Sequence, residues 1–380
     1  MLACVACAVL AGIAVPGPAV AADEVPALPS GDKACVGSSP ATVGQPVWGQ
    51  LRMNAEAVWP LSKGLGVRVA IVDSGVSALS PALSGAVLPG RDVVAGGRAD
   101  ADCKGRGTVL AGLVAARPRK GSALTGVAPD VEVLPIRIAG ADGKVDADRI
   151  ADGLTAAVEG GAEVVVVGVG VPTATGKLRQ AADAAEAADV VVVAAVSGDN
   201  EPQVWYPAAY PTVIAVNGET PDGKVTVVAP AGAGVDLTAP GAAVSLAPVG
   251  DGHYAVAGTA VAAAYTGGAA ALVRTRFPKL TAKQVRTRLE ETAEHPLRRA
   301  DLVTMGAGSV DAYAAVAGLD RQPDVLPVDV EPLALPPVPV TPAGPRIAAA
   351  TAGGVAVAAA LTVAILAWVR QSRRRRAGES

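Results

Sequence analysis

The feature that most constrains the fold is a set of short runs that are apolar throughout and rich in β-branched residues. A strand with one buried face alternates apolar and polar residues, whereas a strand buried on both faces is continuously apolar, as in a parallel sheet covered by helices. The runs therefore predict the central strands of such a sheet. They lie at residues 67–72, 131–138, 164–169, 190–196 and 213–216.

Helical patterns alternate with these runs. Residues 147–158 and 177–187 each separate two predicted strands, an order typical of a doubly wound α/β domain with helices on both faces of a parallel sheet. Further on, Thr281 and Gln284 have the spacing of a capping box, which predicts a helix that runs to about Thr292. The predicted fold class is therefore α/β.

The two ends of the chain predict export and anchoring. Residues 1–22 are apolar and end on small residues, as a secretory signal peptide does, although no Lys or Arg precedes the apolar run. Residues 347–369 are uncharged and long enough to cross roughly 30 Å of hydrocarbon as a helix. The arginines that follow, at 370 and 373–376, belong on the cytoplasmic side. An ordinary apolar N-terminus and a buried core helix are the alternatives.

The predicted organisation is that of a single-pass protein of the cell membrane, with the bulk of the chain outside the cytoplasm and the C-terminus inside. Prolines recur through residues 321–346, a composition that forms an extended, semi-rigid linker. The predicted parts are a signal peptide at 1–22, an N-terminal extension at 23–64, a folded domain at 65–320, the linker at 321–346, a transmembrane helix at 347–369 and a basic tail at 370–380.

Charge and cysteine content limit the partners and cofactors. The formal net charge is −3, and the folded part has no basic stripe, so we do not expect nucleic acid as a partner. Two of the four cysteines lie in the predicted signal peptide, which leaves Cys35 and Cys103. We predict a disulfide between them, because disulfides persist outside the cytoplasm; two free thiols are the alternative. Neither belongs to a Cys/His cluster, so no metal and no cofactor is predicted.

Four motifs follow one another in an order that resembles the subtilases. They are DSGV at 73–76, GRGT at 105–108, AAVSGDN at 194–200 and GTAVAAA at 258–264. The resemblance implies a subtilisin-like fold, and it places Asp73 at the catalytic aspartate, Arg106 at the histidine position and Ala260 at the serine position. Asp199 stands at the oxyanion asparagine, or Asn200 does if the alignment shifts by one residue.

The flanks of the domain resemble the mycosins, the subtilases associated with type VII secretion. The features that carry this resemblance are Cys35, QPVW at 45–48, AVWPLSKG at 57–64, the proline-rich linker and the predicted membrane helix. In mycosins the cysteine of the N-terminal extension typically pairs with one beside the histidine loop, which fits Cys35 and Cys103. The resemblance implies the membrane and type VII secretion membrane components as partners.

The substitutions in these motifs predict the loss of serine-protease chemistry, which needs a hydroxyl nucleophile, an imidazole base and donors for the oxyanion. Ala260 has no hydroxyl, and the guanidinium of Arg106 has no lone pair to accept a proton. Neither His253 nor His295 is expected to replace the base. We expect Asp73 and Arg106 to form a charge pair, because an unpaired buried carboxylate is costly; a turn-capping role for Asp73 alone is the alternative.

The sequence leaves three functions open. The first is a membrane-anchored pseudoprotease that stabilises a type VII secretion assembly. The second is a module that binds extended peptides in the old substrate cleft without cutting them, since strand addition does not need the catalytic residues. The third is a serine-type endopeptidase with residual activity from an unconventional nucleophile such as Ser74 or Ser197.

Overall fold

The computed structural model divides the chain into two compact units, Met1–Asp329 and Val330–Ser380. In the second unit the described positions are helical. None of the helices among the described residues is long and apolar enough to cross a membrane. The predicted signal peptide and linker, and most of the predicted transmembrane helix and basic tail, lie outside the described residues. The structure describes residues 25–30, 35–140, 142–196, 203–228, 234–296, 302–318, 361, 363–365, 367–368 and 370.

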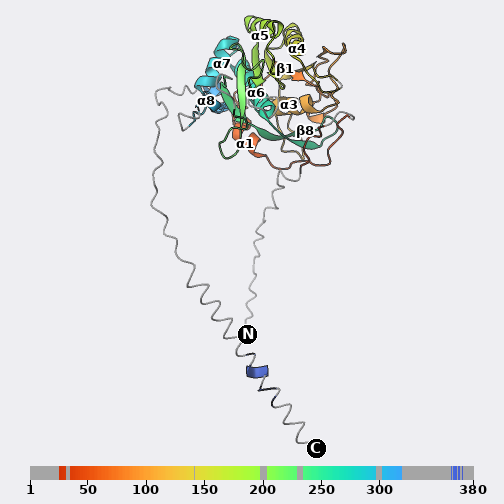
Figure 1. Cartoon of the computed structure of the whole chain (residues 1–380), viewed down its shortest axis with the longest axis vertical. Coiled ribbons are helices and arrows are strands. Elements are labelled where there is room, and N and C mark those ends of the chain that lie inside the picture. Colours follow the sequence, from red (N-terminus) through yellow and green to blue (C-terminus); the bar gives the residue numbers. More distant parts are fainter. Residues whose placement is uncertain are drawn as a thin grey trace, which may run out of the picture. The chain divides into compact units, whose positions relative to one another are not determined.

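A seven-stranded parallel sheet forms the centre of the first unit (Figure 1), in the order β2-β3-β1-β4-β5-β6-β7. Each of the five predicted apolar runs forms one of its strands, which confirms the parallel sheet. The strands are β1 (Arg68–Asp73), β2 (Arg91–Asp92), β3 (Glu132–Arg137), β4 (Val164–Val167), β5 (Val191–Ala195), β6 (Ile214–Glu219) and β7 (Leu237–Pro240).

Helices cover both faces of the sheet. Alternate residues of each strand point to opposite faces, so neighbouring residues of a strand contact different helices. Val69 and Ile71 of β1 pack in the cluster that contains helices α3 (Arg106–Ala115) and α6 (Thr259–Arg276). Ala70 and Val72 pack in the cluster that contains α4 (Ala147–Glu159) and α5 (Gly176–Ala187). In Figure 1, α4 and α5 lie together at the top of the folded unit. The strands are buried on both faces, as their uninterrupted apolar sequences require.

The helices predicted from the sequence agree with the structure to within a residue or two at each end. Helix α4 begins at Ala147, where the side chain of Asp146 accepts a hydrogen bond from the amide of Arg149. Helix α7 (Ala282–Glu291) begins with the predicted capping box. The remaining helices are α1 (Trp48–Met53), α2 (Ala55–Val58), η2 (Pro81–Leu83), α8 (Leu302–Met305) and α9 (Ala312–Ala317).

A two-stranded hairpin, β8 (Ala242–Leu246) and β9 (His253–Ala257), connects the sheet to helix α6. The N-terminal extension lies along this hairpin: the amide of Leu28 donates to the carbonyl of Ala255, at 3.0 Å. The buried side chain of His253 accepts a hydrogen bond through Nδ1 from the amide of Val43, at 2.9 Å. The extension therefore packs against the hairpin that precedes α6.

Candidate functional site

The candidate site lies at the carboxyl end of β1, in the middle of the sheet. From β1 the chain passes to β2 and β3 on one side and then to β4 on the other. A reversal of this kind opens a crevice at the carboxyl ends of parallel strands, where α/β proteins usually bind their ligands. Asp73 is the last residue of β1 and is fully buried, so the strand places a carboxylate at this edge of the sheet.

Arg106 lies directly beside that carboxylate. Its Nε is 2.8 Å from Oδ1 and 3.1 Å from Oδ2 of Asp73, and Oδ1 also accepts a hydrogen bond from the amide of Ser74, at 2.7 Å. The Arg106 side chain is 40% exposed, whereas that of Asp73 is 0% exposed. The structure thus confirms the expected charge pair between Arg106 and the buried carboxylate of Asp73.

Two glycines allow this approach. A Cβ on Gly107 would lie 1.9 Å from the carbonyl oxygen of Gly75, so the first turn of α3 rests directly on the turn that follows β1. A Cβ on Gly168 would lie 2.3 Å from Oδ2 of Asp73. Only a residue without a side chain fits at either position, and this close packing fixes the start of α3 against the carboxyl ends of β1 and β4.

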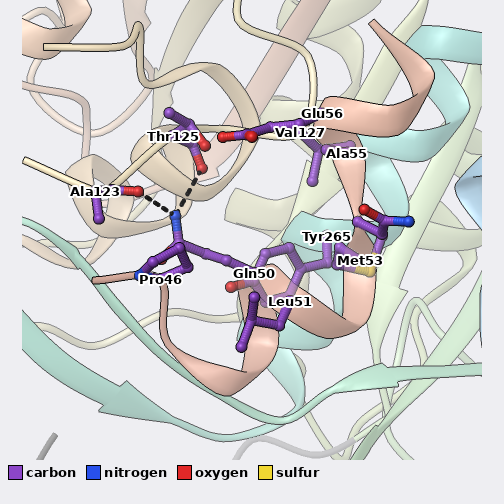
Figure 2. Close-up of a pocket in the computed structure, with 11 residues that line it drawn as sticks. Pro46, Gln50, Leu51, Met53, Ala55, Glu56, Ala123, Thr125, Val127 and Tyr265 are labelled. Atoms are coloured by element: carbon purple, nitrogen blue, oxygen red, sulfur yellow. Dashed lines mark hydrogen bonds between the residues drawn. The ribbon is translucent and has the colours of Figure 1, made fainter. Parts of the chain in front are cut away.

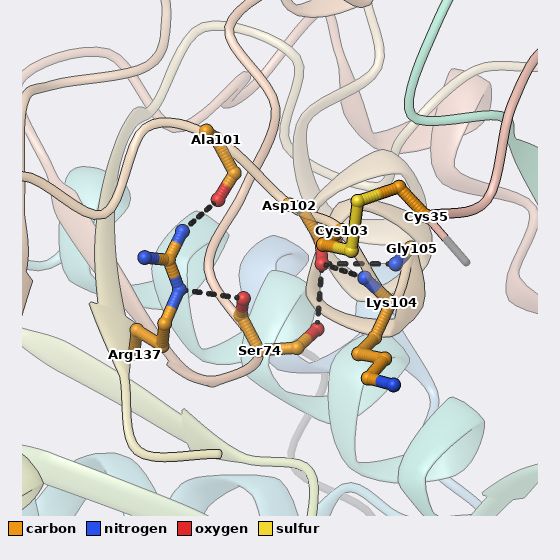
Figure 3. Close-up of a disulfide and its surroundings, with 8 residues drawn as sticks. All are labelled: Cys35, Ser74, Ala101, Asp102, Cys103, Lys104, Gly105 and Arg137. Carbon is orange, nitrogen blue, oxygen red and sulfur yellow. Dashed lines mark hydrogen bonds between the residues drawn. A yellow bond between two sulfur atoms is a disulfide. The ribbon is translucent and has the colours of Figure 1, made fainter. Parts of the chain in front are cut away.

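The start of α3 is held by a second buried carboxylate, that of Asp102 (Figure 3). Gly105, the residue before the helix, has no side chain to cap it, and Asp102 takes over that role. Its Oδ2 accepts from the amide of Thr108 at 2.8 Å and from the Thr108 hydroxyl at 2.7 Å. Its Oδ1 accepts from the amide of Gly105 and from the hydroxyl of Ser74, both at 2.9 Å.

Burial raises the pKa of the Asp102 carboxyl above its ordinary value, although the hydrogen bonds from Thr108, Ser74 and Gly105 act in the opposite direction. The hydroxyl of Ser74 has both of its roles filled, because it also accepts a hydrogen bond from the amide of Gly107 at 3.0 Å. The network therefore connects the turn after β1 to the first turn of α3.

A disulfide joins Cys35 of the N-terminal extension to Cys103, the residue next to Asp102 (Figure 3). The amide of Val36 adds a hydrogen bond to the carbonyl of Cys103, at 2.8 Å. On the other side of the loop, the guanidinium of Arg137 donates to the carbonyl of Ser74 at 3.1 Å and to that of Ala101. The segment that leads into α3 is thus fastened from both sides.

The other predicted site positions are distributed as follows. Ala260 is the second residue of α6 and packs at the edge of the core. Gly258, with a φ of 124°, is the residue immediately before this helix. Asp199 and Asn200 both lie outside the described residues. The side chain of His253 holds the N-terminal extension, and Nδ1 of His295 lies 2.7 Å from the carbonyl oxygen of Ala307. Across the part of the chain that the structure describes, no group of three or more His, Cys, Asp or Glu side chains could hold a metal ion.

Sequence reasoning did not identify Asp102, Thr108 or Arg137 as parts of this site. Thr108 belongs to the GRGT motif, and Asp102 precedes a cysteine predicted to be bonded, but neither pattern indicates a buried carboxylate. Arg137 ends an apolar strand, and that position alone does not indicate a hydrogen-bonded side chain. Their contacts depend on which loops meet at the carboxyl edge of the sheet, which the local sequence does not specify.

Comparison with known proteins places the chain in a family. The Peptidase_S8 model, described as the subtilase family, matches residues 64–321. Mycosin-4 of Mycobacterium tuberculosis is 33% identical over 372 residues, which cover 85% of this chain and 80% of mycosin-4. Subtilisin DY of Bacillus licheniformis is 34% identical over 257 residues, which cover 67% of this chain and 92% of the subtilisin.

Solved structures show the same similarity. MycP3 protease from the type VII (ESX-3) secretion system is 30% identical with a TM-score of 0.65, covering 77% of this chain and 94% of its own. MycP1, described as a serine protease and an essential component of the type VII (ESX-1) secretion system, is 27% identical with a TM-score of 0.65, covering 79% and 98%. The chain therefore belongs to the subtilase family and is similar to the mycosins over most of its length.

Proposed function

We propose that this protein is a mycosin-like pseudoprotease: a subtilase without serine-protease activity that serves as a structural component of a type VII secretion system. The observation that carries the proposal is the contact between Arg106 Nε and the buried carboxylate of Asp73, at 2.8 and 3.1 Å. In an active subtilase the carboxylate orients an imidazole base. Here a permanently charged donor takes that place.

The chemical argument has two independent parts. Arg106 has no acceptor lone pair, so it cannot remove a proton from a nucleophile. Ala260 has a methyl group where a nucleophile would need a hydroxyl. A carboxylate from Asp199 at the oxyanion position would add repulsion to the developing negative charge, and Asn200 in that position would not replace the missing base and nucleophile.

The scaffold role is proposed from the relatives and from the predicted organisation of the chain. MycP1 is described as an essential component of a type VII secretion system. We propose the same class of partner for this chain, with a signal peptide at 1–22, a linker at 321–346 and a single membrane-spanning helix at 347–369 that holds the folded domain outside the cytoplasm and the basic tail inside. Such a tether would keep the domain beside a membrane assembly.

A fluorophosphonate probe, which labels activated serines, tests the loss of activity. We expect neither labelling nor casein cleavage with the purified full-length chain in detergent. The triple variant Arg106→His, Asp199→Asn, Ala260→Ser should regain labelling if the substrate cleft has kept the shape that catalysis needs. Ala260→Ser alone is the matched control and should stay unlabelled, because it has no base. Labelling of the unmodified chain would refute the proposal.

A separate experiment tests the scaffold role. Membranes solubilised in a mild detergent should release this chain in a large complex, from which an affinity tag on the C-terminal tail recovers type VII secretion membrane proteins. Recovery of the chain alone, at the size of a monomer in detergent, would contradict the scaffold role and leave the loss of activity unaffected.

A second candidate function, peptide capture without cleavage, is favoured by one feature of the hairpin formed by β8 and β9. An apolar groove with a volume of about 440 Å³ runs over β8 and β9 as far as Ala257, with Trp48 on its wall. The chain's own residue Ala27 already lies along β9 there as a bridge partner of Ala255, so a peptide would lie in the groove beside Ala27. A peptide library displayed against the purified chain should yield apolar extended sequences whose binding falls when Ala257→Asp is introduced.

The third reading, residual hydrolysis, has little support from the described residues. The Ser74 hydroxyl donates to Asp102 and accepts from Gly107, and Ser74 is only 5% exposed. A hydroxyl held in this way cannot reach a substrate. Ser197 lies outside the described residues, so the probe experiment is its test.

A further inference from the structure

The last part of the N-terminal extension before α1, residues 36–47, forms a strap against the hairpin that is fixed at both ends. At one end, Cys35 is bonded to Cys103. At the other end, α1 is anchored by Gln50, whose side-chain amide donates to the carbonyl of Ala123 at 3.0 Å (Figure 2). A displacement of the middle of the strap would therefore leave the extension attached to the folded unit.

The middle of the strap is held by His253, the first residue of β9. The amide of His253 donates to the carbonyl of Ala41 at 2.8 Å. Its ring Nδ1 accepts from the amide of Val43 at 2.9 Å, and the carbonyl of Val43 accepts from the amide of Ala123 at 2.8 Å. One histidine thus fastens the strap with both its main chain and its side chain.

These contacts fix the protonation state of the ring. A backbone amide can only donate, so Nδ1 of His253 must carry a lone pair, and the proton of the neutral ring lies on Nε2. Nε2 is 3.2 Å from the Ser122 hydroxyl, which can accept that hydrogen bond. A proton on Nδ1 would set two N–H groups against each other at 2.9 Å, in a residue that is 1% exposed. The closed strap therefore requires a neutral ring.

The surroundings of the ring offer little to stabilise an imidazolium. Residues 36–47 contain no ionisable side chain. The charged groups near the ring are Asp251, from the turn between β8 and β9, and Arg119 and Lys120, from the segment after α3. Asp251 pairs with Arg119 at 3.3 Å, and its side chain is 65% exposed, so water screens its charge. Burial lowers the pKa of His253, although Asp251 acts in the opposite direction.

We propose that His253 is an acid-sensitive latch: its protonation releases residues 41–43 from β9, while both ends of the strap stay fixed. The buried side chain of Val43 keeps the strap closed at neutral pH, because release would expose its apolar surface. Release would also leave the amide of His253 without its partner Ala41, at the outer edge of a strand. An unpaired edge of this kind accepts extended chain. Acid would therefore open a position for a peptide strand, whether or not the protein cleaves peptides.

Proton linkage gives the size of the effect. In the released form, the ring of His253 titrates with the ordinary pKa of about 6.5. If the closed form bound no proton at all, the equilibrium constant for release would rise by about 30-fold between pH 7.5 and pH 5. Some protonation of the closed form makes the rise smaller. We therefore expect an increase of roughly 10- to 30-fold.

Hydrogen exchange of the Val43 amide, on the full-length chain in detergent, tests the latch. Its protection factor, corrected for intrinsic exchange at each pH, should fall roughly 10- to 30-fold from pH 7.5 to pH 5. Low concentrations of urea should leave this protection unchanged, because a local opening exposes little surface. The amide of Val165, a fully buried residue of β4, should be better protected and should respond to urea. Protection of Val43 that ignores pH, or that equals Val165 in size and urea response, would overturn the proposal.

Variants assign the response to the ring. In His253→Asn, the side-chain oxygen replaces Nδ1 as the acceptor for Val43 and cannot be protonated, so protection of Val43 should change less than twofold with pH. His295→Asn is the matched control. It replaces the only other histidine of the chain, an exposed residue, and should keep the full response. The same acid response in His253→Asn would contradict the latch.

A measurement on the unmodified chain keeps the test valid if His253→Asn does not fold. Nitrogen NMR of isotope-labelled histidine rings should show an unprotonated Nδ1 and a protonated Nε2 for His253 at pH 7.5. The opposite tautomer at that pH would overturn the proposal, because Nδ1 would then be unable to hold the strap.

Discussion

At the scale of single residues, the pairing of Asp73 with Arg106 accounts for a carboxylate that has no contact with solvent. Removal of one partner from a buried pair leaves an uncompensated charge, which costs far more than the pair itself contributes. Because Asp73 is 0% exposed and Arg106 is 40% exposed, the cost would fall almost entirely on the aspartate. We therefore expect Arg106 to stabilise the fold by compensating the buried charge of Asp73.

This pairing gives a prediction for Arg106→Ala. We expect the free energy of unfolding at pH 7 to fall by about 2 kcal/mol, below the usual 3–5 kcal/mol for a buried pair, because water reaches the exposed side of Arg106. Adding Asp73→Asn to Arg106→Ala should restore part of the loss, since the uncompensated charge is then gone. Urea unfolding of the purified chain measures both. A stability that Arg106→Ala leaves untouched would remove the pair from the determinants of the fold.

His253 gives a prediction about pH. Its Nδ1 must be unprotonated to accept from the amide of Val43, and its Nε2 lies 3.2 Å from the Ser122 hydroxyl. Asp251, which pairs with Arg119, is a charged group near it. Burial lowers the pKa of His253 below 6.5, although Asp251 acts in the opposite direction. The unfolded chain therefore binds the proton more readily, and stability falls as the pH drops through and below about 6.5.

We expect the melting temperature to decrease between pH 7.5 and pH 5, and His253→Gln, which cannot be protonated, to show a smaller decrease. Differential scanning calorimetry at both pH values makes the comparison. The same decrease in both proteins would assign the pH dependence to other groups.

At the scale of elements, what the sequence could predict depended on how each element is buried. The five apolar runs identified β1, β3, β4, β5 and β6, because double-sided burial leaves a continuous apolar sequence. The strands β2, with Arg91 and Asp92, and β7, which ends at Pro240, have no such run. Helices α3 and α6 are buried almost all round, so neither has the one-sided pattern that indicates a helix.

The candidate site could be predicted only in part, because some of its residues come together through loops that are far apart in the sequence. Positions 73, 106 and 260 came from the resemblance to subtilase motifs, and the structure brings 73 and 106 into contact. Asp102 and Arg137 take part through loops that are far apart in sequence, and no local pattern marks them.

The contact between the start of α3 and the end of β1 predicts the effect of Gly107→Ala. A Cβ there would meet the carbonyl oxygen of Gly75 at 1.9 Å, and neither backbone segment can move without disturbing the sheet. We expect the free energy of unfolding to fall by about 3 kcal/mol, the upper end of overpacking costs. Gly176→Ala on α5, where nothing lies within 4 Å, is the control and should stabilise by about 0.5 kcal/mol. Equal effects of the two substitutions would contradict the close approach.

At the scale of the whole molecule, the disulfide determines how firmly the N-terminal extension is bound to the folded unit. Cys35 and Cys103 are 68 residues apart, so the bond restricts a long loop in the unfolded chain. It also ends directly beside Asp102, whose carboxylate caps the helix that carries Arg106. Loss of the bond should therefore affect both the stability of the unit and the order of the candidate site.

For Cys103→Ser we expect a loss of about 4 kcal/mol in the free energy of unfolding, the loop-entropy value for this separation. Reduction of the unmodified chain with a dithiol should lower its stability to that of the variant, and reduction of the variant should change nothing further. Guanidinium unfolding with and without the reductant measures the difference. Unchanged stability after complete reduction, verified by thiol counting, would contradict the prediction.

The hydrogen bond from Val43 to His253 joins residues that are 210 positions apart, and this separation has a consequence for the order of folding. Contacts between distant residues form late, because most of the intervening chain must first be organised. The extension leads the chain in sequence, yet its docking surface on β9 exists only after the sheet and the hairpin have formed. In a pulsed hydrogen-exchange experiment, the amide of Val43 would therefore be among the last to become protected. The time at which it becomes protected would mark the completion of folding.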